Sequence, residues 1–278
     1  MIQLGLIGYP LGHSLSPRIH KAALDASGLS GNYSLFPIEP DDPNGLKDVL
    51  DRVRTGEISG LNVTIPHKQN VIPYIEELTP TAQAIGAVNT VYLRDNRLIG
   101  ENTDAPGFLS DLNTFLNTET RRHGENSALV LGAGGSARAV VYALVTGGWQ
   151  VTVAARRTEQ AEQLAARFDG VNVQELNIQT FQCANPHLIV NTTPIGMTPD
   201  IDRSPWPENR AFPARAAIYD LVYNPRQTKL VQDACAQGLP ATTGLGMLVE
   251  QAALSFEIWT GCKPSRQALF ESLNPSAH

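Results

Sequence analysis

Short apolar runs alternate with amphipathic helical patterns along the whole chain. Runs such as 2–7 and 61–64 have the length and the β-branched content of buried strands, and segments with apolar residues at helical spacing separate them. This alternation is typical of α/β proteins with parallel strands. With 278 residues, the chain is long enough for two domains that each bury a core.

The pattern divides the chain near its middle. In the first half it predicts helices that begin near Pro17 and Asn44, a turn at Asp95-Asn96, and strands at 2–7, 33–36, 61–64, 87–92 and 98–101. A helical segment at 105–117 leads into the polar stretch 118–126, a predicted linker. The second half shows strands at 128–131, 151–154, 188–191 and 217–221, a proline-rich surface loop at 194–213, and a last long helix at about 245–259. No strand is predicted after that helix, which could pack back on the first half.

The second set of strands opens with a glycine motif. Gly132, Gly134 and Ala137 fit the pattern G-x-G-x-x-A directly after strand 128–131 and before an apolar helix. The first glycine permits a tight turn, the second lets a pyrophosphate approach the backbone, and the small third residue lets the helix pack on the strand. Free amides at the helix N-terminus then face the phosphate. The context predicts a dinucleotide site.

The end of the second strand of this set indicates which dinucleotide binds. Arg156 and Arg157 stand where an NAD enzyme usually places an acidic residue for the ribose hydroxyls. Guanidinium groups bind a 2′-phosphate, so NADP is favoured. The two arginines could instead be a solvated surface pair, and Glu159 could serve a ribose, which leaves dual cofactor use open.

The segment GLNVTIPHK at 60–68 combines a short apolar strand with a turn fixed by Pro66. The turn is expected to present Thr64, His67 and Lys68 together. With Asn89 and Asp104 also at strand ends, the Lys68 ammonium is a candidate proton donor to a small polar ligand. His67 is a rival acid, because its ordinary pKa lies near neutrality.

Charge and composition exclude several classes of function. A net charge of −6 without a basic stripe argues against nucleic-acid binding. The start of the chain has no basic leader, and no apolar run reaches membrane-spanning length, so no membrane partner and a cytoplasmic location are expected. Cys183, Cys235 and Cys262 fit neither a disulfide framework nor a metal site, which indicates structural thiols and no metal.

Several separated motifs carry a resemblance to a known family. In order they are GYP at 8–10, HSLSP at 13–17, NVTIPHK at 62–68, GAVNT at 86–90, GENTD at 100–104, GAGG at 132–135, NTTPIGM at 191–197 and GLGMLVEQ at 244–251. With them the chain resembles the shikimate dehydrogenase family over nearly its full length. The resemblance implies NADPH-dependent, reversible reduction of 3-dehydroshikimate to shikimate in aromatic amino-acid (chorismate) biosynthesis.

The resemblance also implies a domain plan. It gives an N-terminal α/β substrate domain, residues 1–104 joined by the C-terminal helices 244–278, and a Rossmann-type NADP domain with its linker helix at 105–243. The active site would be the cleft between them. A monomer or weak homodimer is expected.

Site residues follow from the resemblance position by position. Lys68 and Asp104 would be catalytic, and the substrate set would be Ser14, Ser16, Thr64, Lys68, Asn89, Asp104, Tyr223 and Gln251. Ser14 and Ser16 would hold the substrate carboxylate; in an extended stretch both hydroxyls would point to one side, although Ser16 before Pro17 is also a good helix N-cap. The cofactor set would be Gly132, Ala133, Gly134, Gly135, Ser136, Arg156, Arg157, Thr158, Thr192, Leu221 and Gly244.

Two positions depart from the family pattern. Arg156 stands where relatives often have asparagine, so Arg157 is the preferred candidate for the contact with the 2′-phosphate. Leu221 replaces a methionine often found near the nicotinamide. Two alternatives stay open: a quinate/shikimate dehydrogenase that uses NAD, and a nucleotide-binding regulator without turnover. The regulator would be expected to lose Lys68 or Asp104, and both are present.

Overall fold

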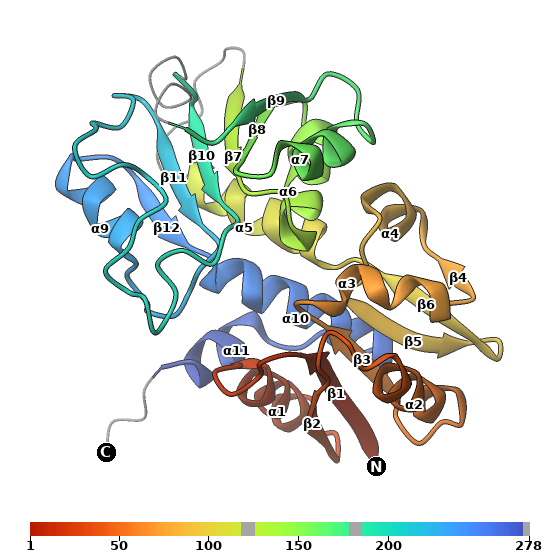
Figure 1. The fold of residues 1–278 in the computed structure, drawn as a ribbon. Helices are drawn as coiled ribbons and strands as arrows, with labels where there is room; N and C mark the ends of the chain where they lie inside the picture. Colours follow the sequence, from red (N-terminus) through yellow and green to blue (C-terminus); the bar gives the residue numbers. More distant parts are fainter. Residues whose placement is uncertain (118–125, 178–184, 275–278) are drawn as a thin grey trace. The chain divides into compact units, whose positions relative to one another are not determined.

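The chain forms two compact units (Figure 1). The computed structural model describes residues 1–117, 126–177 and 185–274. The first unit takes residues 1–107 together with the C-terminal segment from Val249, and the second takes 108–248. Two helices, α5 (Asp104–Asn117) and α10 (Leu245–Thr260), carry the chain from one unit into the other. The predicted linker 118–126 lies outside the described residues except for Asn126.

The first unit is built on a six-stranded sheet in the order β2-β1-β3-β5-β6-β4. Its strands are β1 (Ile2–Gly8), β2 (Gly31–Pro37), β3 (Gly60–Val63), β4 (Glu77–Leu78), β5 (Thr90–Arg94) and β6 (Arg97–Glu101). The predicted strand 87–92 therefore begins only at Thr90. Asp95 and Asn96 have φ of 50° and 62°, the left-handed values that a two-residue hairpin turn between β5 and β6 requires.

This sheet is mixed, because the predicted hairpin at Asp95-Asn96 adds antiparallel pairs to the parallel strands. β1 pairs in parallel with β2 and β3, but β5 pairs antiparallel with both β3 and β6. The short loop at Asp95-Asn96 explains the pair of β5 and β6, since two residues can reverse a strand but cannot make the crossover that parallel pairing needs. The antiparallel entry of β5 places Asn89, just before it, beside the carboxyl end of β3.

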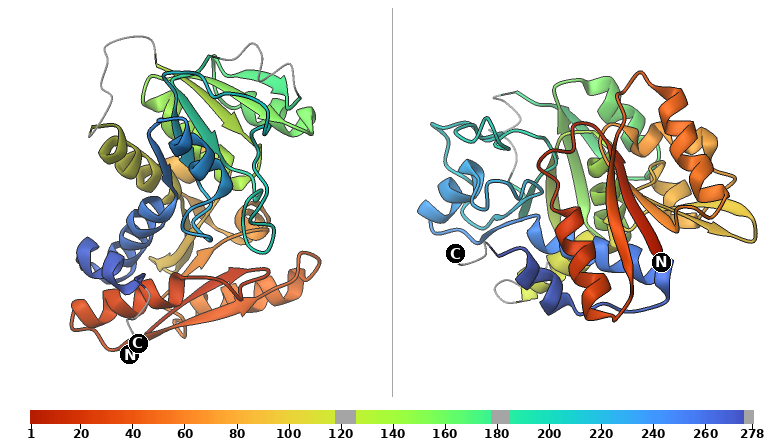
Figure 2. Two further views of the ribbon diagram at one scale, coloured as in Figure 1. Left: turned by 90° about the vertical axis from the view of Figure 1, so that its left-hand side faces the viewer. Right: turned by 90° about the horizontal axis from the view of Figure 1, so that it is seen from below.

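Helices cover this sheet and complete its core. They are α1 (Ser16–Ala26), α2 (Pro43–Arg54), α3 (His67–Asn70), the 3-10 turn η1 (Ile72–Tyr74), α4 (Pro80–Ile85) and α11 (Arg266–Ser272). The apolar face of α2, with Leu46, Leu50 and Val53, packs against Leu61 of β3 and Val91 of β5. The C-terminal part of the chain belongs to this unit, with α11 beside α1 (Figure 2).

The second unit has a fully parallel six-stranded sheet in the order β12-β11-β10-β7-β8-β9. Its elements are β7 (Ser127–Leu131), α6 (Gly135–Thr146), β8 (Gln150–Ala155), α7 (Thr158–Ala165), β9 (Asn172–Glu175), β10 (Leu188–Asn191), β11 (Ala217–Asp220), α9 (Lys229–Ala236) and β12 (Ala241–Thr243). Read from β9 this is the doubly wound order, in which the direction of winding reverses between β7 and β10. Ligands of such sheets bind at the carboxyl ends of the strands at this reversal, where the glycine motif lies.

The proline-rich segment 194–213 is more than the predicted surface loop. Trp206 and Phe212 are buried, stack with ring centroids 4.8 Å apart, and belong to the core formed by Leu129, Ile189 and Ile218. Two large aromatic side chains anchor the loop, because burying them removes much apolar surface from water.

The longest helix of the described ranges, α10, has 16 residues, and none of the helices there could span a bilayer.

Candidate functional site

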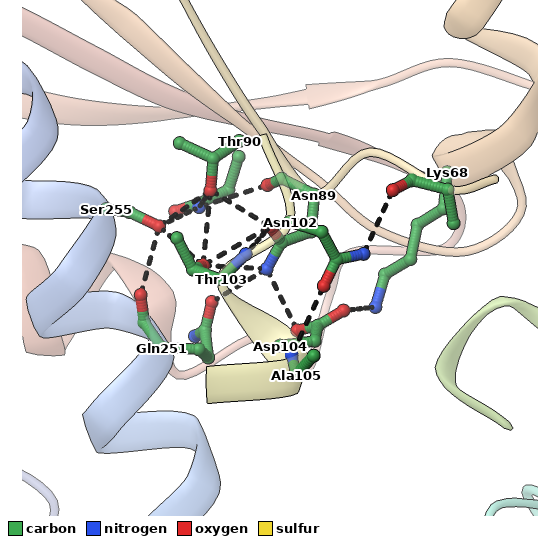
Figure 3. Close-up of polar contacts among 11 residues, drawn as sticks. Lys68, Asn89, Thr90, Asn102, Thr103, Asp104, Ala105, Gln251 and Ser255 are labelled. Carbon is green, nitrogen blue, oxygen red and sulfur yellow. Dashed lines mark hydrogen bonds and ion pairs between the residues drawn. The ribbon is translucent and has the colours of Figure 1, made fainter. Parts of the chain in front are cut away.

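Lys68 lies one residue into α3, immediately after the turn that follows β3. Val88 N–H donates to the Lys68 carbonyl over 2.7 Å, which fixes its backbone beside the segment leading into β5. Its side chain is 11% exposed, and Nζ lies 2.7 Å from Oδ2 of Asp104, whose side chain is 7% exposed (Figure 3). A charge-assisted hydrogen bond in so dry a place holds both groups in one geometry. Such a pair can hand a proton to an adjacent oxygen and take it back.

Asn89 connects this ion pair to the C-terminal helix. Its Nδ2 donates to Asp104 Oδ1 over 2.9 Å and lies 3.4 Å from Gln251 Oε1 on α10. Its Oδ1 accepts from the Thr103 amide over 2.7 Å, which orients the side chain (Figure 3). Four of the predicted site residues, Lys68, Asp104, Asn89 and Gln251, thus meet within the first unit.

His67 does not join them, contrary to the expectation that Thr64, His67 and Lys68 are presented together. Its ring is 1% exposed, and Nε2 lies 2.8 Å from the carbonyl oxygen of Ile38, to which it donates. The imidazole is therefore committed to the core of the unit, which disfavours it as the rival acid.

A buried polar cluster that the sequence did not reveal supports the site from behind. Ser255 Oγ on α10 lies 3.0 Å from Asn62 Nδ2, 2.8 Å from Thr90 Oγ1 and 3.0 Å from Thr103 Oγ1. All four side chains are buried. The sequence offered only a weak signal: Ser255 lies one helical turn after Gln251, within the mostly apolar stretch 252–256.

Ser14 and Ser16 lie at the start of α1 in a conformation that differs from the predicted extended one. The helix begins at Ser16, and the residue between the two serines, Leu15, is already helical with φ −86° and ψ −7°. Ser14 Oγ accepts from the Ser16 amide over 3.3 Å, so Ser14 rather than Ser16 satisfies a free amide of the first turn. The N-cap role expected of Ser16 is wrong for this reason.

Ser16 is nevertheless connected to the buried cluster. Its hydroxyl is hydrogen-bonded to that of Tyr33, which donates to Asn62 Oδ1 over 2.8 Å. His20 Nε2 lies 3.1 Å from the same oxygen, and the His20 ring stacks on Tyr33 at 4.4 Å between centroids. Burial lowers the pKa of His20 to about 3, so this ring is neutral over the working range of pH.

Thr64 follows β3 and lies against the end of β1. A Cβ added to Gly8 would come within 2.3 Å of Thr64 Cγ2, so only glycine fits there. The Thr64 amide donates to the Ile7 carbonyl over 2.8 Å, and its side chain is partly exposed.

In the second unit the glycine turn has the shape of a phosphate-binding loop. Gly132 has φ +108°, a value that side chains other than glycine rarely adopt, and an added Cβ would lie 2.7 Å from Thr192 Oγ1. Gly134 faces open space, and α6 begins after it without a side-chain cap on its amides. The amides of Gly135 and Ser136 in the first turn fit a bound phosphate group.

The remaining cofactor candidates sit at the same carboxyl edge of the sheet. Arg156 and Arg157 are exposed directly after β8, and Arg157 precedes the first residue of α7, Thr158. Leu221 follows β11 and lies against Gly244, where an added Cβ would be 2.4 Å from the Leu221 carbonyl oxygen. Ala133 lies between the first two glycines. The two exposed guanidinium groups fit the 2′-phosphate of NADP, and the uncapped N-terminus of α6 fits its pyrophosphate.

Tyr223 also belongs to this unit. It lies two residues after Leu221 and is partly buried, and burial raises the pKa of its hydroxyl.

Within the described ranges, no group of three or more His, Cys, Asp or Glu side chains is arranged to hold a metal ion. Of the cysteines, Cys235 is exposed and Cys262 partly buried, both as free thiols, and Cys183 lies outside those ranges.

Comparison with known protein families gives three matches along the chain. Residues 6–91 match the shikimate dehydrogenase substrate binding domain, 116–195 match shikimate / quinate 5-dehydrogenase, and 244–269 match the shikimate 5′-dehydrogenase C-terminal domain. The chain is 39% identical to the NADP(+)-dependent shikimate dehydrogenase of Shouchella clausii over 96% of both chains.

Solved structures give the same result. Shikimate 5-dehydrogenase of Thermus thermophilus, crystallised with NADP(H) and shikimate, matches with a TM-score of 0.86 and 39% identity over 98% of each chain. Quinate dehydrogenase of Corynebacterium glutamicum, in complex with NAD, matches with a TM-score of 0.87 and 32% identity, again over 98% of each chain.

Proposed function

This chain belongs to the shikimate dehydrogenase family, and we propose that it catalyses the reversible, NADPH-dependent reduction of 3-dehydroshikimate to shikimate. The observation that carries the proposal is the buried ion pair between Lys68 and Asp104, 2.7 Å apart beside Asn89 and Gln251. An ammonium held this way in a substrate-binding unit is placed for proton transfer to a small polyhydroxylated acid.

The chemistry divides between the cofactor and the chain. Bound NADPH supplies a hydride to the carbonyl carbon of the substrate, which leaves a negative charge on the oxygen. Lys68 Nζ donates a proton to that oxygen as the alcohol forms, and the neutral amine then recovers a proton from solvent. In the reverse direction the neutral amine takes the proton from the alcohol. Asp104 holds the amine in place and would accept a hydrogen bond from a neighbouring substrate hydroxyl.

The substrate contacts follow from which groups can donate and accept. Ser14 and Ser16 lie at the N-terminus of α1 and have hydroxyls that would donate to the substrate carboxylate, and the positive end of the helix dipole favours an anion there. Thr64, Asn89 and Gln251 would bind the ring hydroxyls, and Tyr223 would contribute from the second unit. Ser255 would orient Asn89 from behind, because its hydroxyl bonds to Thr103, whose hydroxyl in turn donates to Asn89 Oδ1.

The cofactor is proposed to be NADP because of charge at the end of β8. Arg157, exposed at the start of α7, would bind the 2′-phosphate together with Thr158. Arg156 would stack on the adenine or offset the charge of the same phosphate. The pyrophosphate would lie over Gly132 to Ser136, and the nicotinamide end near Thr192, Leu221 and Gly244. No acidic residue lies between Ala155 and Thr158 to repel the extra phosphate.

A direct assay tests the proposal. The purified protein is mixed with shikimate and NADP+, and the absorbance of reduced cofactor is followed, with the variant Lys68→Met as the inactive reference. Turnover by the wild type and its loss in the variant support the proposal. A folded wild-type protein that binds NADP+ but does not oxidise shikimate would contradict it.

A second candidate is quinate/shikimate oxidation with NAD, favoured by the similarity to the quinate dehydrogenase crystallised with NAD and by Glu159 in the first turn of α7. The same assay with quinate and with NAD+ separates the two. The two arginines predict a higher kcat/KM with NADP+ than with NAD+. Arg157→Ala should lower the kcat/KM for NADP+ and so reduce the ratio between the two cofactors.

The location and assembly remain predictions from the sequence. A cytoplasmic enzyme, monomeric or weakly dimeric, is proposed, and sedimentation equilibrium over a range of protein concentrations tests the assembly.

A further inference from the structure

Three polar side chains are completely buried where the second sheet turns toward its cofactor edge. Asn191 ends β10, Asp220 ends β11 and Thr228 precedes α9, and each is 0% exposed. Asn191 Nδ2 donates to Asp220 Oδ1 over 2.8 Å, and Thr228 Oγ1 donates to Asp220 Oδ2 over 2.6 Å. The carboxylate thus joins three segments that are distant in the sequence.

The same cluster holds the backbone of the two loops that leave β10 and β11. Val222 N–H donates to Asp220 Oδ1 over 3.0 Å, and Leu221 N–H donates to the Asn191 carbonyl over 2.9 Å. Asn191 Oδ1 accepts from the Thr193 amide at 2.9 Å and from its hydroxyl at 2.7 Å. These bonds fix Thr193, Leu221 and Val222, which stand next to the predicted site residues Thr192 and Tyr223 in the chain.

Both loops lie on the nicotinamide side of the sheet. The winding reverses between β7 and β10, the phosphate turn follows β7, and the arginines that select the adenosine end follow β8. A dinucleotide laid across the reversal places its other end over β10 and β11. The cluster would then lie beneath the nicotinamide half of a bound cofactor.

Within the described part of the chain, the Asp220 carboxylate accepts its hydrogen bonds from uncharged donors. Its donors are Asn191, Val222 and Thr228, all uncharged, and burial raises its pKa to about 6. Of the neighbouring charged or titratable groups, Lys229 of α9 is bonded to Asp233 at 2.6 Å, and Tyr219 of β11 donates to Asp111 of α5. The pKa of Tyr223 is raised by burial, and β10 and β12 contribute no charged side chain. An ionised carboxylate without a counter-ion is costly to bury, and such groups gather at functional sites.

We propose that Asp220 is a positioning residue for the nicotinamide end of the cofactor, acting in its ionised form through Asn191, Val222 and Thr228. The inference rests on the proposed function, because it assigns these loops to NADP. When Asp220 takes up a proton, one oxygen becomes a donor and the carboxyl can no longer accept all three hydrogen bonds in the same geometry. The loops then loosen, and cofactor affinity falls on the acid side.

The expected size follows from the ionised fraction. With a pKa of about 6, roughly one molecule in eleven is ionised at pH 5, so an apparent Kd that depends on the ionised form rises about tenfold between pH 8 and pH 5. The 2′-phosphate of NADP titrates in the same range, so the useful quantity is the ratio of the wild-type Kd to the variant Kd.

The test uses calorimetric titration with NADP+ at pH 5 to 8 on the wild type and on Asp220→Asn, Thr228→Val and Asp233→Asn. Asp220→Asn is nearly isosteric, keeps an oxygen for Asn191 and Val222, and is uncharged at every pH. Because the amide is never ionised, we expect its Kd at pH 8 to be about tenfold above wild type, and the ratio of wild-type to variant Kd to rise about tenfold toward pH 5, where the wild type is mostly protonated as well. Thr228→Val removes a donor to the ionised form and should move the acid limb up by roughly one pH unit. Asp233→Asn, on α9 but outside the cluster, should follow the wild type.

Three results would overturn the inference or its premise. A ratio that stays constant from pH 8 to pH 5 refutes the role of the ionised form. Wild-type affinity at pH 8 in Asp220→Asn, or an unmoved acid limb in Thr228→Val, shows that the charge of Asp220 does not position the cofactor. A wild-type protein that is folded but binds no NADP+ at pH 8 contradicts the proposed function itself and is thereby distinguished from the first two.

Discussion

Lys68→Met tests both the chemistry and the energetics of the site, because one substitution removes the proton donor and leaves a buried carboxylate without its partner. Methionine keeps the length and the apolar stem of lysine. The side chains of Lys68 and Asp104 are only 11% and 7% exposed, so water cannot solvate the Asp104 carboxylate once the ammonium is removed, as it would on the surface. Breaking such a pair by removing one partner costs roughly 3–5 kcal/mol of folding free energy.

Turnover should fall more steeply than stability alone would explain. General acid catalysis contributes about 10²–10⁴-fold, equivalent to about 3–5 kcal/mol of transition-state stabilisation. The proposed cofactor residues belong to the other unit, so the Kd for NADP+ should stay within about twofold of wild type; a tenfold change would require 1.36 kcal/mol. We therefore expect kcat to fall at least a hundredfold with cofactor affinity retained.

A double-mutant cycle separates the charge effect from the loss of packing. Lys68→Met and Asp104→Asn should each destabilise the protein, whereas the double variant contains no unpaired charge and should be more stable than the sum of the two losses by about 1–3 kcal/mol. Chemical denaturation followed by fluorescence measures the cycle. Lys21→Met is the matched control: it breaks an exposed 2.7 Å pair with Asp25 and should change stability by about 1 kcal/mol or less.

Two outcomes would refute this reasoning. Retention of more than a tenth of the wild-type kcat by Lys68→Met would exclude Lys68 as the proton donor. Strictly additive losses in the cycle would show that the two charges do not depend on each other, and that the pair is not the desolvated one described above.

Three further predictions concern other parts of the molecule. Because the pKa of His20 is depressed from 6.5 to about 3, its contribution to stability is present above pH 6.5 and is lost as pH falls; at pH 5 the loss is about 2 kcal/mol, and His20→Phe should flatten this part of a urea-denaturation profile against pH. Arg157→Ala should raise the Kd for NADP+ at least tenfold and that for NAD+ little, with Arg156→Ala smaller, and equal effects on both cofactors would contradict the 2′-phosphate assignment. Trp206→Ala should destabilise the second unit by about 3–5 kcal/mol, because the loop loses its buried anchor; a melting temperature equal to that of the wild type would show that the loop is held elsewhere.

The sequence by itself determined the features that depend on local backbone geometry and residue type. The glycine turn at Gly132 could be predicted because a strand, a left-handed residue and an apolar helix follow one another within a few positions. The turn at Asp95-Asn96 and the proline that ends β3 were predictable for the same reason. Lys68 and Asp104 could be named from their motifs and expected to form a pair, and the structure confirms the pair with 2.7 Å between Nζ and Oδ2.

Only the tertiary structure decided which distant polar groups meet. Asn62 and Ser255 are 193 positions apart and become partners because the chain returns to the first unit through α10. His67 and Lys68 are neighbours in sequence, yet one faces the Ile38 carbonyl and the other Asp104. Asp220 read only as the polar end of an apolar strand, and the strand order then placed Asn191 and Thr228 around it. The reason is physical: local sequence fixes backbone conformation within a few residues, whereas the partner of a buried polar group depends on which strands and helices pack beside it.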